Sequence, residues 1–260
     1  MPKSKTASDV ALEDPSAPRV NRLAIQVATV NGSGSQTANN TLLRALFQMG
    51  LPVSGKNLFP SNIQGLPTWF TIRVNEDGYI ARVREVDLMV CMNPATVEED
   101  VRDLAPGTTV VCEQTLKVER FRDDLNVYAV PFNKIVREVC DPVSLRKLVV
   151  NMIYVGVVGE LIGIDPEEIE RALQNAFRSK PKALALNRDA VLAGREWAEA
   201  NAESKPAIQV ERRDLTGGKI LVDGNSACAV GCIFAGLTVM AWYPITPSSS
   251  VAEKVQSLAN

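Results

Sequence analysis

The first regular pattern of apolar and polar residues in the chain lies between Leu23 and Met49. The apolar run over residues 23–28 predicts a buried strand, and apolar positions three and four apart over Thr41–Met49 predict a helix. Gly32 and Gly34 interrupt the pattern between these two segments, which is typical of a turn. The opening unit is therefore expected to be a strand, a glycine loop and a helix.

Further along the chain, short apolar runs alternate with longer segments of helical spacing. Residues 86–92 are almost continuously apolar, as in a strand covered on both faces. Asp165 before Pro166 is typical of a helix start, because aspartate caps free backbone N–H groups and proline suits the first helical position. This alternation predicts an α/β fold with a mostly parallel sheet covered by helices. Strands are expected at Trp69–Val74, Leu88–Met92, Thr109–Cys112 and Val127–Pro131, and helices at Thr96–Leu104, Ser144–Gly163, Pro166–Phe177 and Asn187 to about Asn201.

Composition shifts along the chain indicate four segments. Residues 1–19 are polar and charged and are expected to form a disordered leader. Residues 20–200 form the α/β domain, and the polar stretch 201–218 is expected to be a linker or surface crossing. Residues 219–260 predict a helix over Ser226–Gly236, a strand over Thr238–Trp242 and a helix from Ser248. One strand between two helices cannot form a stable sheet alone, so this last segment is expected to be incomplete and to need further chain.

Composition narrows the chemistry that the chain can perform. Its 260 residues include no histidine, which excludes Ser–His–Asp and Cys–His catalysis and histidine-ligated zinc. The net charge of −2 offers no basic field for nucleic acid. No apolar run is long enough for a membrane span, and the N-terminus lacks a secretory signal. The five cysteines contain no CxxC pair and are interpreted as reduced core residues of a cytoplasmic protein.

The glycine loop is a candidate anion site, because backbone N–H groups at the start of a helix attract negative charge. A dinucleotide fold would carry an acidic residue about 20 positions later, but no Asp or Glu occurs between Asp14 and Glu76. The same span carries five cations. A dinucleotide is therefore disfavoured, which leaves two interpretations open: a ligand with phosphate groups that needs no such acid, or a tight turn that binds nothing. The ligand-binding residues would be Gly32, Ser33, Gly34, Ser35 and Gln36.

Near the end of the chain, a small-residue helix that begins Gly224-Asn225 is followed by the run Tyr-Pro-Ile-Thr-Pro-Ser-Ser over residues 243–249. This combination resembles the start of the alpha subunit of 2-oxoacid:ferredoxin oxidoreductases. In that family the segment opens the α/β domain that holds the pyrimidine end of thiamine diphosphate. The resemblance implies that residues 219–260 are the first elements of such a domain.

The stretch from Leu23 to about Ala200 resembles the gamma domain of the same enzymes. Its landmarks are the glycine loop, the Pro-Ser-Asn-Ile-Gln-Gly run at residues 60–65, Asn151-Met152 and the spacing of Asn187, Ala190 and Gly194. Ser35 and Thr37 stand where the family usually has glycines, and Asn62 and Gln64 replace a usual acid and arginine. A gamma domain fused ahead of alpha resembles the 2-oxoglutarate-type members, and pyruvate-type members are the alternative.

The resemblance implies an oxidoreductase subunit that is active only with the rest of alpha and a beta subunit. The reaction would convert 2-oxoglutarate, coenzyme A and oxidised ferredoxin into succinyl-CoA, carbon dioxide and reduced ferredoxin, or run in reverse. Thr246 would lie beside the thiazolium and hydrogen-bond the 2-oxo acid as the catalytic residue, and Tyr243, Pro244 and Ile245 would bind thiamine diphosphate. No metal ligand is expected on this chain, since Mg2+ and a 4Fe–4S cluster belong to the beta subunit. The assembly would be a dimer of alpha–beta heterodimers.

Two rival functions use the first domain differently. The first is a non-catalytic module that binds a coenzyme or nucleotide and only reuses the gamma fold. The second is an NADP-dependent reductase, in which Lys56 or Arg73 would meet the 2′-phosphate. Neither rival has a use for the loop at residues 243–250, so this loop favours the oxidoreductase subunit.

Overall fold

The computed structural model describes residues 19–59, 63–245 and 248–259, so the expected leader lies outside it except for Arg19. The chain divides into two compact units, Met1–Gly217 and Gly218–Asn260. The expected domain boundaries stay a prediction. None of the helices in these described ranges is both long and apolar enough to cross a membrane.

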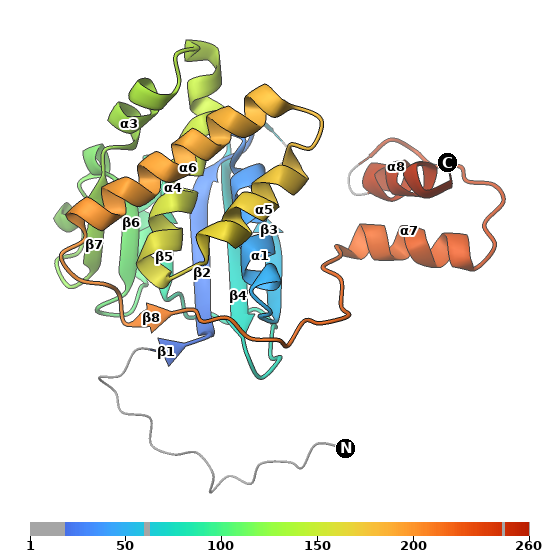
Figure 1. The fold of residues 1–260 in the computed structure, drawn as a ribbon, viewed down its shortest axis with the longest axis horizontal. Coiled ribbons are helices and arrows are strands. Elements are labelled where there is room, and N and C mark those ends of the chain that lie inside the picture. The colour runs from blue at the N-terminus through green and yellow to red at the C-terminus, as the bar shows by residue number, and fades with distance from the viewer. Residues whose placement is uncertain (1–18, 60–62, 246–247, 260) are drawn as a thin grey trace, which may run out of the picture. The chain divides into compact units, whose positions relative to one another are not determined.

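The first unit is built on a six-stranded sheet with the order β3-β4-β2-β5-β6-β7 (Figure 1). Three neighbouring pairs are parallel, namely β2 with β5, β5 with β6, and β6 with β7. The remaining two pairs are antiparallel, because β4 lies between β2 and β3. The predicted α/β fold with a mostly parallel sheet is confirmed. The strands are β2 (Arg22–Val30), β3 (Val53–Leu58), β4 (Pro67–Asn75), β5 (Leu88–Cys91), β6 (Thr109–Glu113) and β7 (Asn126–Val130).

A layer of helices covers one face of this sheet (Figure 1), formed by α1 (Ser35–Gln48), α4 (Val143–Ile162), α5 (Pro166–Ala176) and α6 (Pro181–Asn201). Helix α4 is buried along most of its length, as expected for the most apolar helix of the layer. It crosses α6 closely at Gly156 and Gly194, where an added Cβ would lie 2.0 Å and 2.1 Å from a carbonyl oxygen of the other helix. The other face is covered in part by α2 (Val97–Arg102), and α3 (Phe132–Val139) leads into α4.

The expected strands and helices of the first unit are found close to their predicted positions, and the Asp165 cap is confirmed by a 3.0 Å bond to the Glu167 N–H. Helices α1 and α6 begin several residues earlier than expected. Strand β3 and helix α3 were not expected. The β3 sequence lacks an apolar alternation, and its pairing with β4 makes it a strand.

The stretch 201–217, expected as a linker or surface crossing, is bound to the first unit. Strand β8 (Ile208–Gln209) pairs with β1 (Arg19–Val20), and the Arg213 N–H donates to the Met49 carbonyl over 2.8 Å. Arg212 forms ion pairs with Asp165 at 2.5 Å and with Glu168 at 2.8 Å. These contacts hold the stretch against the end of α1 and the start of α5.

The second unit consists of α7 (Gly224–Phe234) and α8 (Ser248–Ala259), which contact each other. The strand expected over Thr238–Trp242 is wrong, because this segment forms no strand in the structure. A strand needs a partner for its backbone groups, and the described residues of this unit supply none. The core expectation also fails for two cysteines here: Cys228 is exposed and Cys232 is half-buried, whereas Cys91, Cys112 and Cys140 are buried.

Candidate functional site

The glycine loop between β2 and α1 has a backbone that only glycine accommodates without strain. Gly32 and Gly34 have φ angles of 81° and 83°, in the left-handed region that disfavours side chains. A Cβ on Gly34 would lie 2.8 Å from the Leu148 side chain, and one on Gly32 would lie 2.7 Å from the Gln64 side chain. Both glycines therefore serve the turn and the close approach of neighbouring segments.

Three hydrogen bonds fix the loop and the first turn of α1. The Asn151 side chain donates to the Ser33 carbonyl over 2.7 Å, and Thr29 Oγ1 donates to Ser35 Oγ over 2.9 Å. The Tyr154 hydroxyl donates to Asn39 Oδ1 over 2.8 Å. Burial raises the pKa of Tyr154 far above its ordinary value, so the phenol stays a neutral donor. Two residues of α4, Asn151 and Tyr154, therefore hold the loop and the first turns of α1 in place.

A cavity of about 250 Å3 opens above this turn. Its polar side chains form a chain of hydrogen bonds, in which Asn57 donates to Gln36 Oε1 over 3.1 Å and Thr68 donates to Asn57 Oδ1 over 3.2 Å. None of the described side chains that line it is charged. The cavity is lined by Thr29, Asn31, Gly32, Gly34, Ser35, Gln36, Asn39, Asn57, Thr68, Trp69 and Phe70.

The start of α1 gives this cavity a positive electrostatic character. The first backbone N–H groups of a helix have no partner inside the helix, and the N-cap residue Gly34 supplies no side chain to bind them. The first turn carries no acidic residue, so nothing there offsets the positive end of the helix dipole. Neutral amide and hydroxyl donors around free N–H groups suit a phosphate or another anion.

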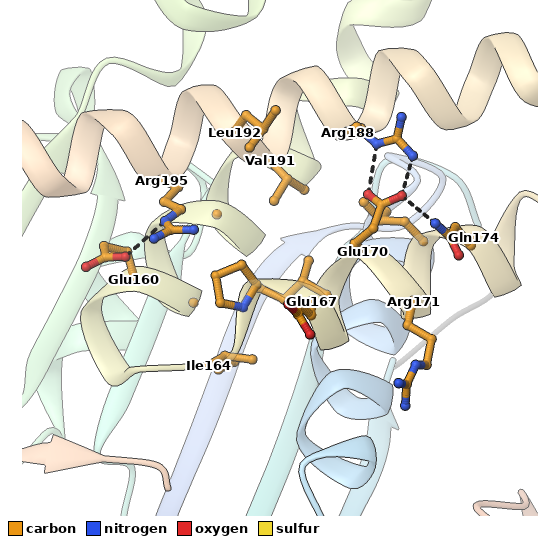
Figure 2. A pocket seen from close by; sticks show the side chains of 15 residues that line it. Glu160, Ile164, Glu167, Glu170, Arg171, Gln174, Arg188, Val191, Leu192 and Arg195 are labelled. Atoms are coloured by element: carbon orange, nitrogen blue, oxygen red, sulfur yellow. Dashed lines mark hydrogen bonds and ion pairs between the residues drawn. The ribbon is translucent and has the colours of Figure 1, made fainter. Parts of the chain in front are cut away.

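A second, larger cavity of about 420 Å3 lies between α4, α5 and α6 (Figure 2). Apolar side chains such as Ile164, Val191 and Leu192 line much of it. Figure 2 shows the Glu170 carboxylate turned toward Arg188 and Gln174, while Arg195 lies against Glu160. Its third arginine, Arg171, pairs with Glu168. Because each of these arginines already contacts a carboxylate, this cavity does not offer an anion site.

The structure brings together only part of the residue set expected from sequence. Gly32, Gly34, Ser35 and Gln36 line the smaller cavity. Ser33 does not, and its hydroxyl oxygen is buried without a hydrogen-bond partner among the described residues. Asn39, Asn57, Asn151 and Tyr154 were not singled out as site residues from sequence. A polar side chain within the apolar stretch 148–158 of α4 was the available signal for Asn151.

The residues expected to contact thiamine diphosphate belong to the second unit, and Thr246 lies outside the described residues. Tyr243 is 78% exposed and Ile245 is 60% exposed. The Ser248 hydroxyl donates within 3 Å to the carbonyl oxygens of both residues, at 2.9 Å and 2.7 Å. The backbone before Thr246 is therefore bound to the first turn of α8, while the side chains of Tyr243 and Ile245 are exposed.

Comparison with known proteins gives this arrangement a family context. The sequence profile of the family described as pyruvate ferredoxin/flavodoxin oxidoreductase matches residues 24–197. The alpha subunit of 2-oxoacid:ferredoxin oxidoreductase 1 from Sulfurisphaera tokodaii is 24% identical over 91% of this chain and 42% of its own length. The 2-oxoglutarate oxidoreductase subunit KorA from Mycobacterium tuberculosis is 22% identical over 95% of this chain and 42% of its own length. The chain thus spans about two-fifths of the curated relatives it matches.

Solved structures share the fold. The 2-oxoglutarate:ferredoxin oxidoreductase from Magnetococcus marinus, solved with 2-oxoglutarate, coenzyme A and succinyl-CoA bound, superposes with a TM-score of 0.80 at 23% identity. This match covers 92% of the present chain and 41% of that one. A pyruvate oxidoreductase subunit from Thermotoga maritima covers 68% of the present chain and 96% of its own, with a TM-score of 0.56 and 19% identity.

Proposed function

We propose a function on the premise that the chain belongs to the pyruvate ferredoxin/flavodoxin oxidoreductase family. The chain supplies the gamma domain and the first elements of the alpha domain of a 2-oxoacid:ferredoxin oxidoreductase. The main support for this proposal is the order of segments along the chain. The domain that matches the family, residues 24–197, is followed in the same chain by the loop at residues 243–249. Neither a nucleotide-binding module nor an NADP-dependent reductase would need that loop.

The proposed reaction converts 2-oxoglutarate, coenzyme A and oxidised ferredoxin into succinyl-CoA, carbon dioxide and reduced ferredoxin, or the reverse. Thiamine diphosphate supplies the electron sink for cleavage next to the carbonyl group, so the absence of histidine is no obstacle. Two of the similar proteins favour 2-oxoglutarate as the substrate. The Mycobacterium tuberculosis subunit is named a 2-oxoglutarate oxidoreductase subunit, and the Magnetococcus marinus enzyme was solved with 2-oxoglutarate bound. Pyruvate is the rival substrate.

The described part of the second unit fits a role in holding thiamine diphosphate together with other chain segments. Tyr243, Pro244 and Ile245 would contact the coenzyme, and the large exposed fractions of Tyr243 and Ile245 leave apolar surface for it to cover. The Thr246 hydroxyl would hydrogen-bond the 2-oxo acid. Magnesium and the 4Fe–4S cluster would be held by the beta subunit. The described residues contain no group of three or more cysteine or acidic side chains placed to hold a metal ion.

The glycine-loop cavity would take a phosphate group of coenzyme A. Gln36 and Asn57 offer amide groups at its wall, and the free N–H groups of the first turn of α1 offer positive charge. The cavity volume of about 250 Å3 suits one end of the coenzyme. Asn151 and Tyr154 would act indirectly, since they hold the loop from α4.

The test is the activity of the complete enzyme, in which the full-length alpha subunit is produced together with its beta subunit. Reduction of ferredoxin or a viologen dye is measured with 2-oxoglutarate or pyruvate, with and without coenzyme A. Turnover that needs both 2-oxoglutarate and coenzyme A is the expected result. Turnover with pyruvate alone among the acids would replace the substrate assignment, and failure to reduce the acceptor with any 2-oxo acid would contradict the proposal.

A further inference from the structure

The face of the sheet that points away from α1 carries two buried polar atoms without partners. Thr71 Oγ1 and Arg73 Nε, both on β4, form no hydrogen bond within the described residues. The Thr71 side chain is well enclosed, since the residue is only 5% exposed. Buried polar atoms in folded proteins nearly always have a partner, so both atoms are available to hydrogen-bond a polar group that binds at this face.

Strand register places these side chains beside a hydroxyl group and a further cation of β3. Arg73 lies opposite Ser54 of β3, and Thr71 lies opposite Lys56. A Cβ on Gly55 would meet Leu43 of α1, so Gly55 faces α1. Because successive residues of a strand alternate between faces, Ser54 and Lys56 point to the other face. Cross-strand partners share a face, so Thr71 and Arg73 lie there with them.

The segment between Ile80 and Asp87 crosses this group. Its first end is bound by the Ser54 hydroxyl, which donates to the Ile80 carbonyl. Its second end is bound to β2, where the Ala24 N–H donates to the Asp87 carboxylate over 2.7 Å. Ser54 and Ala24 are the two cross-strand partners of Arg73. Ser54, Arg73 and Ala24 thus lie side by side on β3, β4 and β2. The segment from Ile80 to Asp87 crosses the sheet over these three residues.

The charges around Arg73 are predominantly positive. Arg82, Arg84 and Glu85 are exposed on the crossing segment, and Lys56 is exposed on β3. With Arg73 these side chains sum to +3, from four cations and one acid. The other nearby carboxylates are engaged elsewhere, since Asp87 pairs with Arg19, and Glu76 and Asp77 pair with Arg22. None of the four cations forms an ion pair within the ranges that the structure describes.

We propose that Thr71 and Arg73 form the floor of a second anion site, which binds a phosphate group, with Lys56, Arg82 and Arg84 as surrounding cations. Arginine presents several N–H donors in a planar fork that matches phosphate oxygens, and the threonine hydroxyl can donate beside it. The net charge of +3 favours a multiply charged phosphate over a single carboxylate. Asn57 and Gly55 of β3 point to the face of α1, so this site is separate from the glycine-loop cavity.

The experiment is a calorimetric titration of the full 260-residue chain with pyrophosphate at low salt. Two sites are expected in the parent protein, one in the glycine-loop cavity and one at Arg73. Arg73→Gln should remove the second site, and Gln36→Glu should remove only the first. Thr71→Val deletes a hydroxyl that can donate to a charged group, and should weaken the second site by about tenfold or more. Arg137→Gln, which removes an exposed arginine on α3, is the matched control and should bind as the parent does.

Thermal unfolding without pyrophosphate gives an independent readout. Thr71→Val keeps the branched shape and removes a buried hydroxyl without a partner, so the variant should be at least as stable as the parent protein while it binds more weakly. A role that is only structural would lower stability and leave binding unchanged.

The outcomes separate this inference from the proposed function. If the parent protein shows one site and Arg73→Gln removes it, the second anion site holds and the glycine-loop assignment fails. If Arg73→Gln does not fold, Arg73→Lys and Thr71→Val carry the test, since both should weaken binding. Unchanged pyrophosphate binding in both Arg73→Gln and Thr71→Val, or in Arg73→Lys and Thr71→Val, would overturn the inference.

Discussion

Individual residues in the glycine-loop cavity determine which charge it accepts. Gln36 lies in the first turn of α1, where its side-chain oxygen accepts a hydrogen bond from Asn57. A glutamate at this position would keep that acceptor and lose only the exposed 3.4 Å donation from the Gln36 amide to Asn40 Oδ1. It would add one negative charge beside the first N–H groups of the helix. It would also interact favourably with the helix dipole, so the fold should not suffer. Gln36 therefore allows ligand binding to be changed without disturbing the turn.

We expect Gln36→Glu to raise the KM for coenzyme A in the complete enzyme by about tenfold, because a carboxylate would repel a phosphate in the cavity. The melting temperature should stay the same or rise. Gln209→Glu makes the same change on β8, beside the start of β2 and therefore far from the loop after β2, and should leave this KM unchanged. An unaltered KM in Gln36→Glu would assign the loop a purely structural role.

The residues that hold the loop could be predicted only in part from the sequence. Gly32, Gly34 and Gln36 were expected, because a strand, a glycine loop and a helix follow one another directly in the chain. Asn151 contacts Ser33 across 118 positions of sequence, and Tyr154 reaches Asn39 in the same way. Such contacts depend on how α4 packs under the loop, which local sequence patterns do not determine.

At the scale of helices and strands, the helix that holds the glycine loop, α4, is itself positioned by its close crossing with α6. Gly156 allows this crossing, since a Cβ there would lie 2.0 Å from the Val191 carbonyl oxygen. We expect Gly156→Ala to lower the free energy of unfolding in urea by about 1–3 kcal/mol, because α6 would be displaced. This loss should appear although alanine favours helix formation over glycine.

Gly231 provides the matched comparison at a helix position where an added side chain would meet no neighbour. An added Cβ on Gly231 of α7 meets nothing within 4 Å. Gly231→Ala should therefore leave stability unchanged or raise it by up to about 1 kcal/mol. Equal effects of the two substitutions would mean that the close crossing does not limit stability.

The attachment of residues 201–217 to α5 should depend on pH. The hydrogen bond from Arg212 is the main reason why the pKa of Asp165 lies below its ordinary value. A lowered pKa in the folded state stabilises the fold above the ordinary carboxyl pKa of about 4, and this contribution is lost as the pH falls below it. Arg212→Gln should therefore be less stable than the parent protein at about pH 6, and the difference should shrink toward about pH 3.

Urea unfolding at several pH values measures this difference. Arg137→Gln removes an exposed arginine that forms no ion pair within the described residues and serves as the control. A difference between Arg212→Gln and the parent protein that stays constant from about pH 6 to about pH 3 would show that the Asp165 carboxylate does not mediate the attachment.

The success of sequence-based prediction differs between the two units for a physical reason. In the first unit, apolar runs such as residues 88–91 are buried in a sheet, and they were recognised from pattern alone. Strand β3 was missed because only its pairing with β4 makes it a strand. In the second unit, residues 238–242 have the pattern of a strand but form none. The pattern of apolar residues shows which side chains a segment could bury. Whether the segment becomes a strand depends on a neighbouring strand that pairs with its backbone.

At the scale of the whole molecule, the two units differ in how much apolar surface they bury. The first unit buries apolar side chains on both faces of its sheet, whereas the described residues of the second unit bury only Ala229, Ala252 and Val255 of their apolar side chains. Phe234 is 88% exposed. Ile220, Val239 and Tyr243 of the same unit are also at least 78% exposed. Several exposed apolar side chains in one small unit are typical of a surface that other chain segments or a partner cover, as the proposed function requires.

The most direct test of the proposed function is the steady-state reduction of ferredoxin by the complete enzyme carrying Thr246→Val. Loss of one hydrogen bond to a charged group corresponds to about 1.5–3 kcal/mol, so kcat/KM for the 2-oxo acid should fall by roughly 10- to 150-fold. Thr246→Ser keeps the hydroxyl and should retain most activity, and both variants should still assemble with the beta subunit and bind thiamine diphosphate. Parent-like kinetics in Thr246→Val would contradict the account.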